Sequence, residues 1–167
     1  LNFIENNQSI LIEVIKFGNI ECLKTVLTEG ANPNLAIGTT TALATASIGA
    51  FLNIDKVKLL LEYNADPNFV SFSSRTTILP LFSDDIEVLK LLLDNGADPN
   101  VISAVGETPL TYMCFKHGLE KDLSRFKLLL QYIDSVGINQ PSWRRPISER
   151  ISKQLIKLFL ENGANPY

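Results

Sequence analysis

Five short stretches of the chain repeat the same order of apolar and charged positions. In each stretch a lysine precedes a largely apolar triplet, so that apolar positions cover most of a helical circumference and leave one narrow charged strip. The pattern predicts five amphipathic helices, within residues 21–29, 56–62, 87–94, 125–131 and 155–161.

A pentapeptide follows four of these five helices in nearly identical form. It reads Gly-Ala-Asn-Pro-Asn at residues 30–34, and its variants lie at 64–68, 96–100 and 163–167. Its first residue, Gly or Asn, stands where a helix end takes a left-handed conformation, and its Pro cannot continue the helix. A period of about 33 residues is typical of stacked units that are each too small to fold alone.

A second, less regular helix is predicted before each of the five. Its start is marked by Thr-Ala-Leu at 41–43, Thr-Ile-Leu at 77–79 and Thr-Pro-Leu at 108–110. Thr is a good N-cap, and Pro is favoured at the first helical position. Ser9 opens the first repeat in the same way, and Arg145 is the counterpart in the last.

These motifs resemble the ankyrin repeat, whose usual pattern reads T-P-L-H-x-A-A, then G-H, then V-K-L-L-L, then G-A-D-V-N. Residues 9–34 follow that pattern without a gap, with Gly18-Asn19 at the usual Gly-His turn. The resemblance covers nearly the whole chain from Ser9 onward. It implies one all-α ankyrin-repeat solenoid of helix–turn–helix units with short finger loops. The five repeats are placed at about 9–40, 41–76, 77–107, 108–144 and 145–167.

The repeats are uneven in length. Repeats two and four carry a longer connection between their helices, around 51–55 and 117–122, and repeats three and five have a shortened first helix. In repeat four the pentapeptide has degenerated to Ser-Val-Gly-Ile-Asn at 135–139. Drift in a fold that tolerates loop insertions explains such differences, and so does local reshaping of a binding face. The sequence leaves both explanations open.

Composition argues against several classes of function. A net charge of −3 and a pI near 5.2 do not fit a nucleic-acid binder. No apolar run approaches the roughly 18 residues of a membrane span, and no signal-peptide pattern is present. Cys22 and Cys114 lie in different repeats, which fits a reducing compartment, so we expect a cytoplasmic protein. Because the chain begins without Met and stops at the end of a repeat, we also expect a fragment of a longer protein.

Candidate catalytic chemistry is confined to one pair of residues. Cys114 and His117 are three positions apart and could share a helix face, as a nucleophile and its base would. The alternative is that Cys114 is a small buried core residue. No second His or Cys pair supplies a zinc site, and no Gly-rich phosphate loop is present. We therefore expect no enzymatic activity, no metal and no cofactor.

The polar residues of the pentapeptides are interpreted as turn residues bonded to the backbone. This interpretation covers Asn34, Asp66, Asn68, Asp98 and Asn100. The resemblance also implies that an asparaginyl hydroxylase can modify asparagines at such positions. The sequences before Asn68 and Asn100 fit part of that target pattern, although a proline replaces its usual branched residue.

The segments after the pentapeptides are the candidate binding site. The resemblance implies that residues 35–40, 69–76, 101–107 and 140–144 form fingers toward the concave side, and here they are unusually apolar. Their apolar residues either pack between neighbouring fingers or contact a partner. A basic cluster within residues 144–157 is either a solvated helix pair or a patch for an acidic partner. The predicted partner-binding residues are Ile37, Phe72, Arg75, Val105, Trp143, Arg144 and Arg145.

The resemblance implies a non-catalytic module that holds a protein partner along its fingers and concave first helices. We expect a monomer that binds neither nucleic acid nor membrane. An alternative is the substrate-recruiting arm of a larger enzyme, such as a bacterial effector acting in the cytoplasm of a host cell. A catalytic signature in the sequence that flanks this chain would distinguish the two.

Overall fold

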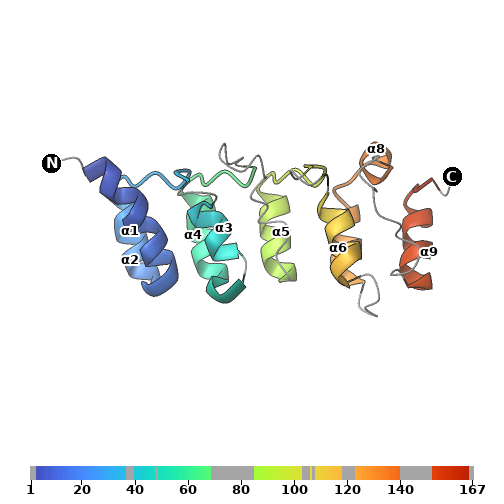
Figure 1. The fold of residues 1–167 in the computed structure, drawn as a ribbon, viewed down its shortest axis with the longest axis horizontal. Coiled ribbons are helices and arrows are strands. Elements are labelled where there is room, and N and C mark those ends of the chain that lie inside the picture. Colours follow the sequence, from blue (N-terminus) through green and yellow to red (C-terminus); the bar gives the residue numbers. More distant parts are fainter. Residues whose placement is uncertain are drawn as a thin grey trace. The chain divides into compact units, whose positions relative to one another are not determined.

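The computed structural model describes residues 3–36, 40–47, 49–68, 85–102, 106, 108–117, 123–139 and 152–165. Every regular element within these ranges is a helix (Figure 1). The all-α prediction is therefore confirmed for this part of the chain. The molecule divides into two compact units, Leu1–Ala97 and Asp98–Tyr167, which are described separately.

The five helices predicted from the lysine and triplet pattern all form. They are α2 (Ile20–Thr28), α4 (Ile54–Glu62) and α5 (Ile86–Asp94) in the first unit, and α7 (Ser124–Leu130) and α9 (Lys153–Glu161) in the second. Four of them begin at a capping side chain, which accepts a hydrogen bond from a backbone amide of the first turn. These caps are Asn19, Asn53, Asp85 and Ser152.

A left-handed residue ends four of these helices, as the pentapeptide predicts. The φ angles are +90° at Gly30, +83° at Gly96, +89° at Gly163 and +61° at Asn64. After each of these residues, the amide of the pentapeptide's alanine donates to the carbonyl five positions earlier, as in Ala31 to Val26 (3.2 Å). This bond belongs to the Schellman motif and turns the chain away from the helix axis.

The first helices of three repeats are described. They are α1 (Phe3–Phe17), α3 (Ala42–Ser47) and α6 (Pro109–His117). The predicted caps at Thr41 and Thr108 are confirmed, because their hydroxyls accept from the amides of Ala44 (3.1 Å) and Thr111 (3.2 Å). The first helices predicted to start at residues 77 and 145 lie outside the described ranges.

The predicted start of α1 at Ser9 is wrong. The helix begins six residues earlier, at Phe3. Residues 3–8 contain neither Pro nor Gly. No residue that strongly disfavours a helix therefore precedes Ser9, and the helix extends through it.

The connection in repeat two differs in detail from the prediction, and the longer connection predicted in repeat four lies, from residue 118 to 122, outside the described ranges. A single 3₁₀ turn, η1 (Gly49–Phe51), follows α3, and α4 has already begun at Ile54, so the additional residues lie closer to α3 than expected. The degenerated pentapeptide of repeat four forms a one-turn helix, α8 (Ser135–Ile138). Asp134 Oδ1 stabilises this turn by accepting from the Gly137 amide at 2.7 Å.

Neighbouring helices bury the core between them. In the first unit α1 packs on α2 and α3, and α4 packs on α2, α3 and α5; the blue helices α1 and α2 lie side by side in Figure 1. Leu23, Leu43 and Leu60 are almost completely buried there. In the second unit the rings of Phe126 and Phe159 meet edge to face, with centroids 6.2 Å apart.

One buried lysine joins the first two repeats. Lys56, at the start of α4, is 7% exposed, and its Nζ donates to the carbonyls of Val14 (3.2 Å), Ile15 (2.7 Å) and Gly18 (2.7 Å). These carbonyls lie at the C-terminal end of α1, where a cation is favourable. Desolvation by burial lowers the pKa of Lys56 below its ordinary value of 10.5, and the neighbouring Cys22 opposes that shift. The sequence pattern did not reveal this contact.

Candidate binding surface

The seven predicted partner-binding residues lie outside the part of the chain that the structure describes. They are Ile37, Phe72, Arg75, Val105, Trp143, Arg144 and Arg145. Their role in binding stays a prediction. The structure describes instead the bases from which the predicted fingers start and the first helices beside them.

Asparagine side chains link successive pentapeptides. Asn34 Nδ2 donates to the carbonyl of Asn64 at 2.9 Å, and its Oδ1 accepts from the Asp66 amide at 2.6 Å. Asn139 makes the same pair of bonds in the second unit, to the Gly163 carbonyl (2.9 Å) and from the Asn165 amide (2.6 Å). Each bridge holds the bases of two successive loops together.

Asn68 makes part of the same link in the first unit. Asn68 Nδ2 donates to the carbonyl of Gly96 at 2.7 Å. In the second unit a Cβ added at Gly137 would overlap the side chain of Asn100, so only glycine fits beside it without displacement. Asn139 keeps both bridging bonds although the sequence around it has degenerated.

The interpretation as turn residues is confirmed for Asp66 and Asp98, whereas the side chains of Asn34 and Asn68 bond to the backbone of the following pentapeptide. Within each of three pentapeptides, the third residue's side-chain oxygen accepts from the amide two positions later, at 2.8–2.9 Å. These acceptors are Asn32, Asp66 and Asp98. The hydroxylation of Asn68 or Asn100 stays untested.

Three apolar residues at the finger bases separate into two groups. Leu35 and Val101, which directly follow their pentapeptides, are half-buried, as expected for residues that pack at a finger base. Ile102, one position further, is 53% exposed. Ile102 thus lies in a segment predicted to be a finger, and its side chain is exposed to solvent. It belongs to the apolar finger residues of the sequence, although it was not among the seven predicted contacts.

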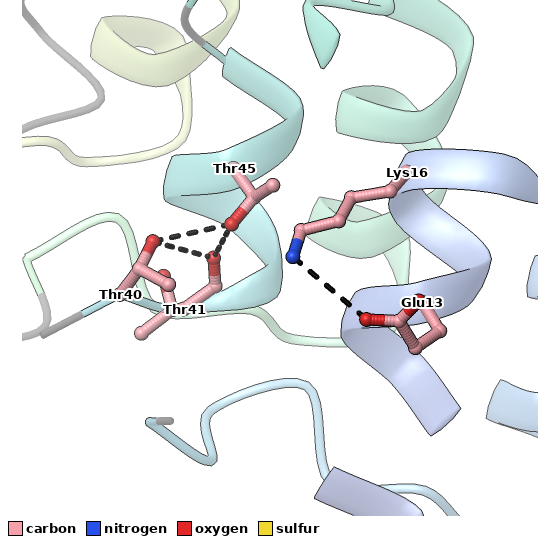
Figure 2. Close-up of polar contacts among 5 residues, drawn as sticks. All are labelled: Glu13, Lys16, Thr40, Thr41 and Thr45. Carbon is pink, nitrogen blue, oxygen red and sulfur yellow. Dashed lines mark hydrogen bonds and ion pairs between the residues drawn. The ribbon is translucent and has the colours of Figure 1, made fainter. Parts of the chain in front are cut away.

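The first helices carry a polar residue at one repeated position. Glu13, Thr45 and Tyr112 each lie four residues after the start signal of their repeat, and all three are exposed or half-buried. Figure 2 shows two of these positions in the first unit, where Glu13 pairs with Lys16 (3.8 Å) on α1. On the adjacent helix α3, the Thr45 hydroxyl donates to the Thr41 carbonyl (2.8 Å) and lies 3.1 Å from the Thr40 hydroxyl.

A second apolar surface lies at the turns between paired helices, and sequence reasoning missed it. Phe17 is 77% exposed and Phe51 37%, and their rings meet edge to face with centroids 6.3 Å apart. Ile20 and Ile86, which begin α2 and α5, are 37% and 40% exposed. The signal that could have found this surface is the repeated Ile followed by an acid at the start of α2, α4 and α5.

The environment of Cys114 does not favour a nucleophile. The side chain is 3% exposed on α6, and burial raises its pKa to about 12. An activated thiol needs the opposite shift, because the thiolate is the reactive form. The interpretation of Cys114 as a buried core residue is confirmed. Cys22 is a free, exposed thiol.

Metal binding and membrane insertion were also considered for the described residues. No group of three or more His, Cys, Asp or Glu side chains there could hold a metal ion. None of the described helices is both long enough and apolar enough to cross a membrane. No protein-family model matches the chain, and neither does any curated protein.

Proposed function

We propose that this chain is an ankyrin-repeat module that binds a protein partner through its finger loops and the concave side of its first helices. The asparagine bridges carry the proposal. Asn34 and Asn139 each make the same two bonds to the following pentapeptide. Within each compact unit the link holds the bases of successive loops together, and repeat proteins use such loops in extended binding surfaces.

The exposed groups near these loops are suited to recognising a protein. The second unit offers the apolar Ile102 and the phenol of Tyr112, and the first unit offers the carboxylate of Glu13 and the hydroxyl of Thr45. A mixture of apolar anchors and hydrogen-bonding side chains is characteristic of protein interfaces. The free thiols of Cys22 and Cys114 support a reducing location, and we propose the cytoplasm.

A comparison of capture by variant proteins tests the binding role. Phe72→Ala combined with Trp143→Ala, and separately Ile102→Ser, should reduce capture of a partner from cell lysate, as quantified by mass spectrometry. The matched control is Ile86→Ser, because Ile86 is 40% exposed but lies at the start of α5. Circular dichroism should show that all three variants keep the helicity of the wild-type protein.

Two results would contradict the proposal. If the finger variants retain full capture, the fingers do not bind the partner. If the Phe72→Ala and Trp143→Ala protein loses its helicity, these residues are packing elements of the scaffold.

A further inference from the structure

Apolar side chains face the solvent at the turns between paired helices of the first unit. The ring contact between Phe17, the last residue of α1, and Phe51, the last residue of η1, joins the turns of two successive repeats. The first residues of α2, α4 and α5 are isoleucines that are exposed or half-buried. We name this set the turn surface: Phe17, Ile20, Phe51, Ile54 and Ile86.

The three isoleucines lie at the same end of the first unit. The helices α2, α4 and α5 each contain nine residues, and α4 packs against both of the others. Asparagine bridges join the loops after their C-terminal ends, from Asn34 to Asn64 and from Asn68 to Gly96. Helices of equal length that are joined at one end and pack side by side also have their other ends side by side.

The turn surface stays exposed inside the stack of repeats. Ile86, in the middle of the chain, is 40% exposed, and Ile20, in the first repeat, is 37% exposed. Phe51 is 37% exposed, although its repeat packs through α4 against the repeats on both sides. A further repeat at an end of the chain would therefore leave these positions exposed.

An exposed acid follows each isoleucine of the turn surface. The neighbouring cations have other partners, because Lys56 donates to carbonyls of α1 and Lys16 pairs with Glu13. No ion pair in the described part of the chain joins any of the three acids to a lysine. The acids are Glu21, Asp55 and Glu87. The turn surface thus combines apolar side chains with a row of negative charge.

The formation of the helices does not require this row. An acid in the first turn does stabilise a helix. However, α7 and α9 form without one, and the residues equivalent to the three acids are Ser124 and Gln154 there. Among the described second helices, the pairing of an isoleucine with an acid is therefore a property of the first unit.

The spacing of the repeats limits the conformation of a ligand that could follow the turn surface. Packed helices lie about 8–10 Å apart. A polyproline II segment has three residues per turn and rises about 3.1 Å per residue, so it advances about 9 Å per turn. Every third residue of such a segment would therefore meet the next repeat on the same side.

We propose that the turn surface binds a basic, proline-rich segment of a partner protein in the polyproline II conformation. Apolar residues at every third position contact the phenylalanines and isoleucines, and the basic residues beside them pair with Glu21, Asp55 and Glu87. Proline-rich segments bind to aromatic side chains in several recognition domains. This contact is separate from the fingers, so its loss leaves the partner of the fingers bound.

Fluorescence anisotropy tests the proposal with a labelled peptide of repeated Pro-Leu-Arg units, long enough to span three repeats. The peptide should bind wild-type protein saturably, whereas a peptide of repeated Pro-Leu-Glu units should not bind. A peptide with the composition of the first but a shuffled order should bind more weakly. These three measurements need no variant, so misfolding cannot affect them.

Variants with matched charge locate the contact. Combined Glu21→Gln, Asp55→Asn and Glu87→Gln should weaken binding of the Pro-Leu-Arg peptide by about fivefold or more. The control combines Glu29→Gln, Glu62→Gln and Asp94→Asn, which change the net charge equally at the C-terminal ends of the same helices, and it should bind as wild type. Phe17→Ser, at a largely exposed position, should weaken binding by about tenfold and keep native helicity.

Several outcomes would overturn the proposal. Equal binding of the Pro-Leu-Arg and shuffled peptides contradicts the polyproline II register, and equal weakening by the two charge variants shows that net charge alone attracts the peptide. Wild-type protein that does not bind the peptide, or a folded Phe17→Ser variant that binds it fully, excludes the turn surface as its site. If sedimentation velocity shows self-association that Phe17→Ser abolishes, a second copy of the chain covers the surface instead.

Discussion

The bridge made by Asn34 gives the most direct prediction about the stability of the stack. Asn34→Ala removes two hydrogen bonds at once, the donation to the Asn64 carbonyl (2.9 Å) and the acceptance from the Asp66 amide (2.6 Å). The backbone groups left behind belong to the next repeat, so the loss weakens the junction between repeats and leaves the turn of residues 30–34 in place.

The size of the effect follows from the number of bonds and their exposure. A net contribution of about 0.5–1.5 kcal/mol per hydrogen bond gives about 1–3 kcal/mol for two bonds. Both bonds are open to solvent, and water can replace part of them. We therefore expect Asn34→Ala to lower the free energy of unfolding by about 1–2 kcal/mol.

Urea unfolding followed by circular dichroism measures this loss. The matched control is Asn32→Ala, in the same pentapeptide, where the side chain accepts one bond, from the Asn34 amide at 2.9 Å. Asn139→Ala should cost as much as Asn34→Ala, because Asn139 makes an equivalent pair of bonds in the second unit. If Asn34→Ala costs no more than Asn32→Ala, the bridges do not stabilise the junctions.

Two further predictions concern buried groups. Lys56→Met keeps the aliphatic stem but removes three hydrogen bonds to backbone carbonyls at the end of α1. The variant also avoids the cost of burying the ammonium group, so we expect the free energy of unfolding to fall by about 1–3 kcal/mol. Exposed Lys58→Met on the same helix should be nearly neutral. Because the folded protein lowers the pKa of Lys56 below 10.5, the unfolded chain holds this proton longer, and the deficit of Lys56→Met relative to wild type should widen as pH rises toward 10.5. A deficit that shrinks over this range would contradict the argument. A thiol reagent at neutral pH should label one cysteine, Cys22, in the folded protein and two in urea. Burial raises the pKa of Cys114 from 9.0 to about 12. The stability that the neutral thiol contributes is therefore complete below pH 9, and above pH 9 the free energy of unfolding should fall by about 1.4 kcal/mol per pH unit. The Cys114→Ala variant should lack this slope. Two labels in the folded state would refute the burial of Cys114.

Local signals in the sequence located most of the described helices. The lysine and triplet pattern placed all five second helices within a few residues of their ends, and Thr41 and Thr108 cap the first helices that follow them. Such signals work because caps, left-handed residues and apolar periodicity act over one or two turns. The predicted start of α1 at Ser9 was wrong. No residue just before Ser9 prevents a helix, so the local sequence does not stop the helix from beginning at Phe3.

The candidate binding site was less accessible to sequence reasoning. Ile102 belongs to a segment identified from its position after a pentapeptide, and its 53% exposure agrees with a surface role. Phe17 and Phe51 were not anticipated, because their ring contact joins residues from different repeats. Contacts of this kind depend on how one repeat is placed against another, and no local pattern encodes that placement.

The sequence by itself determined the periodic elements of this protein. Left-handed Gly30, Gly96 and Gly163 and the capping residues define where helices begin and end, since backbone conformation at these points depends on residue type and near neighbours. Only the tertiary structure decided what those elements do together. It brought Lys56 to the end of α1 and kept Asn139 as a bridge within a degenerated loop. Both features depend on groups 24 or more residues apart, and proximity of that kind exists only after the repeats have packed.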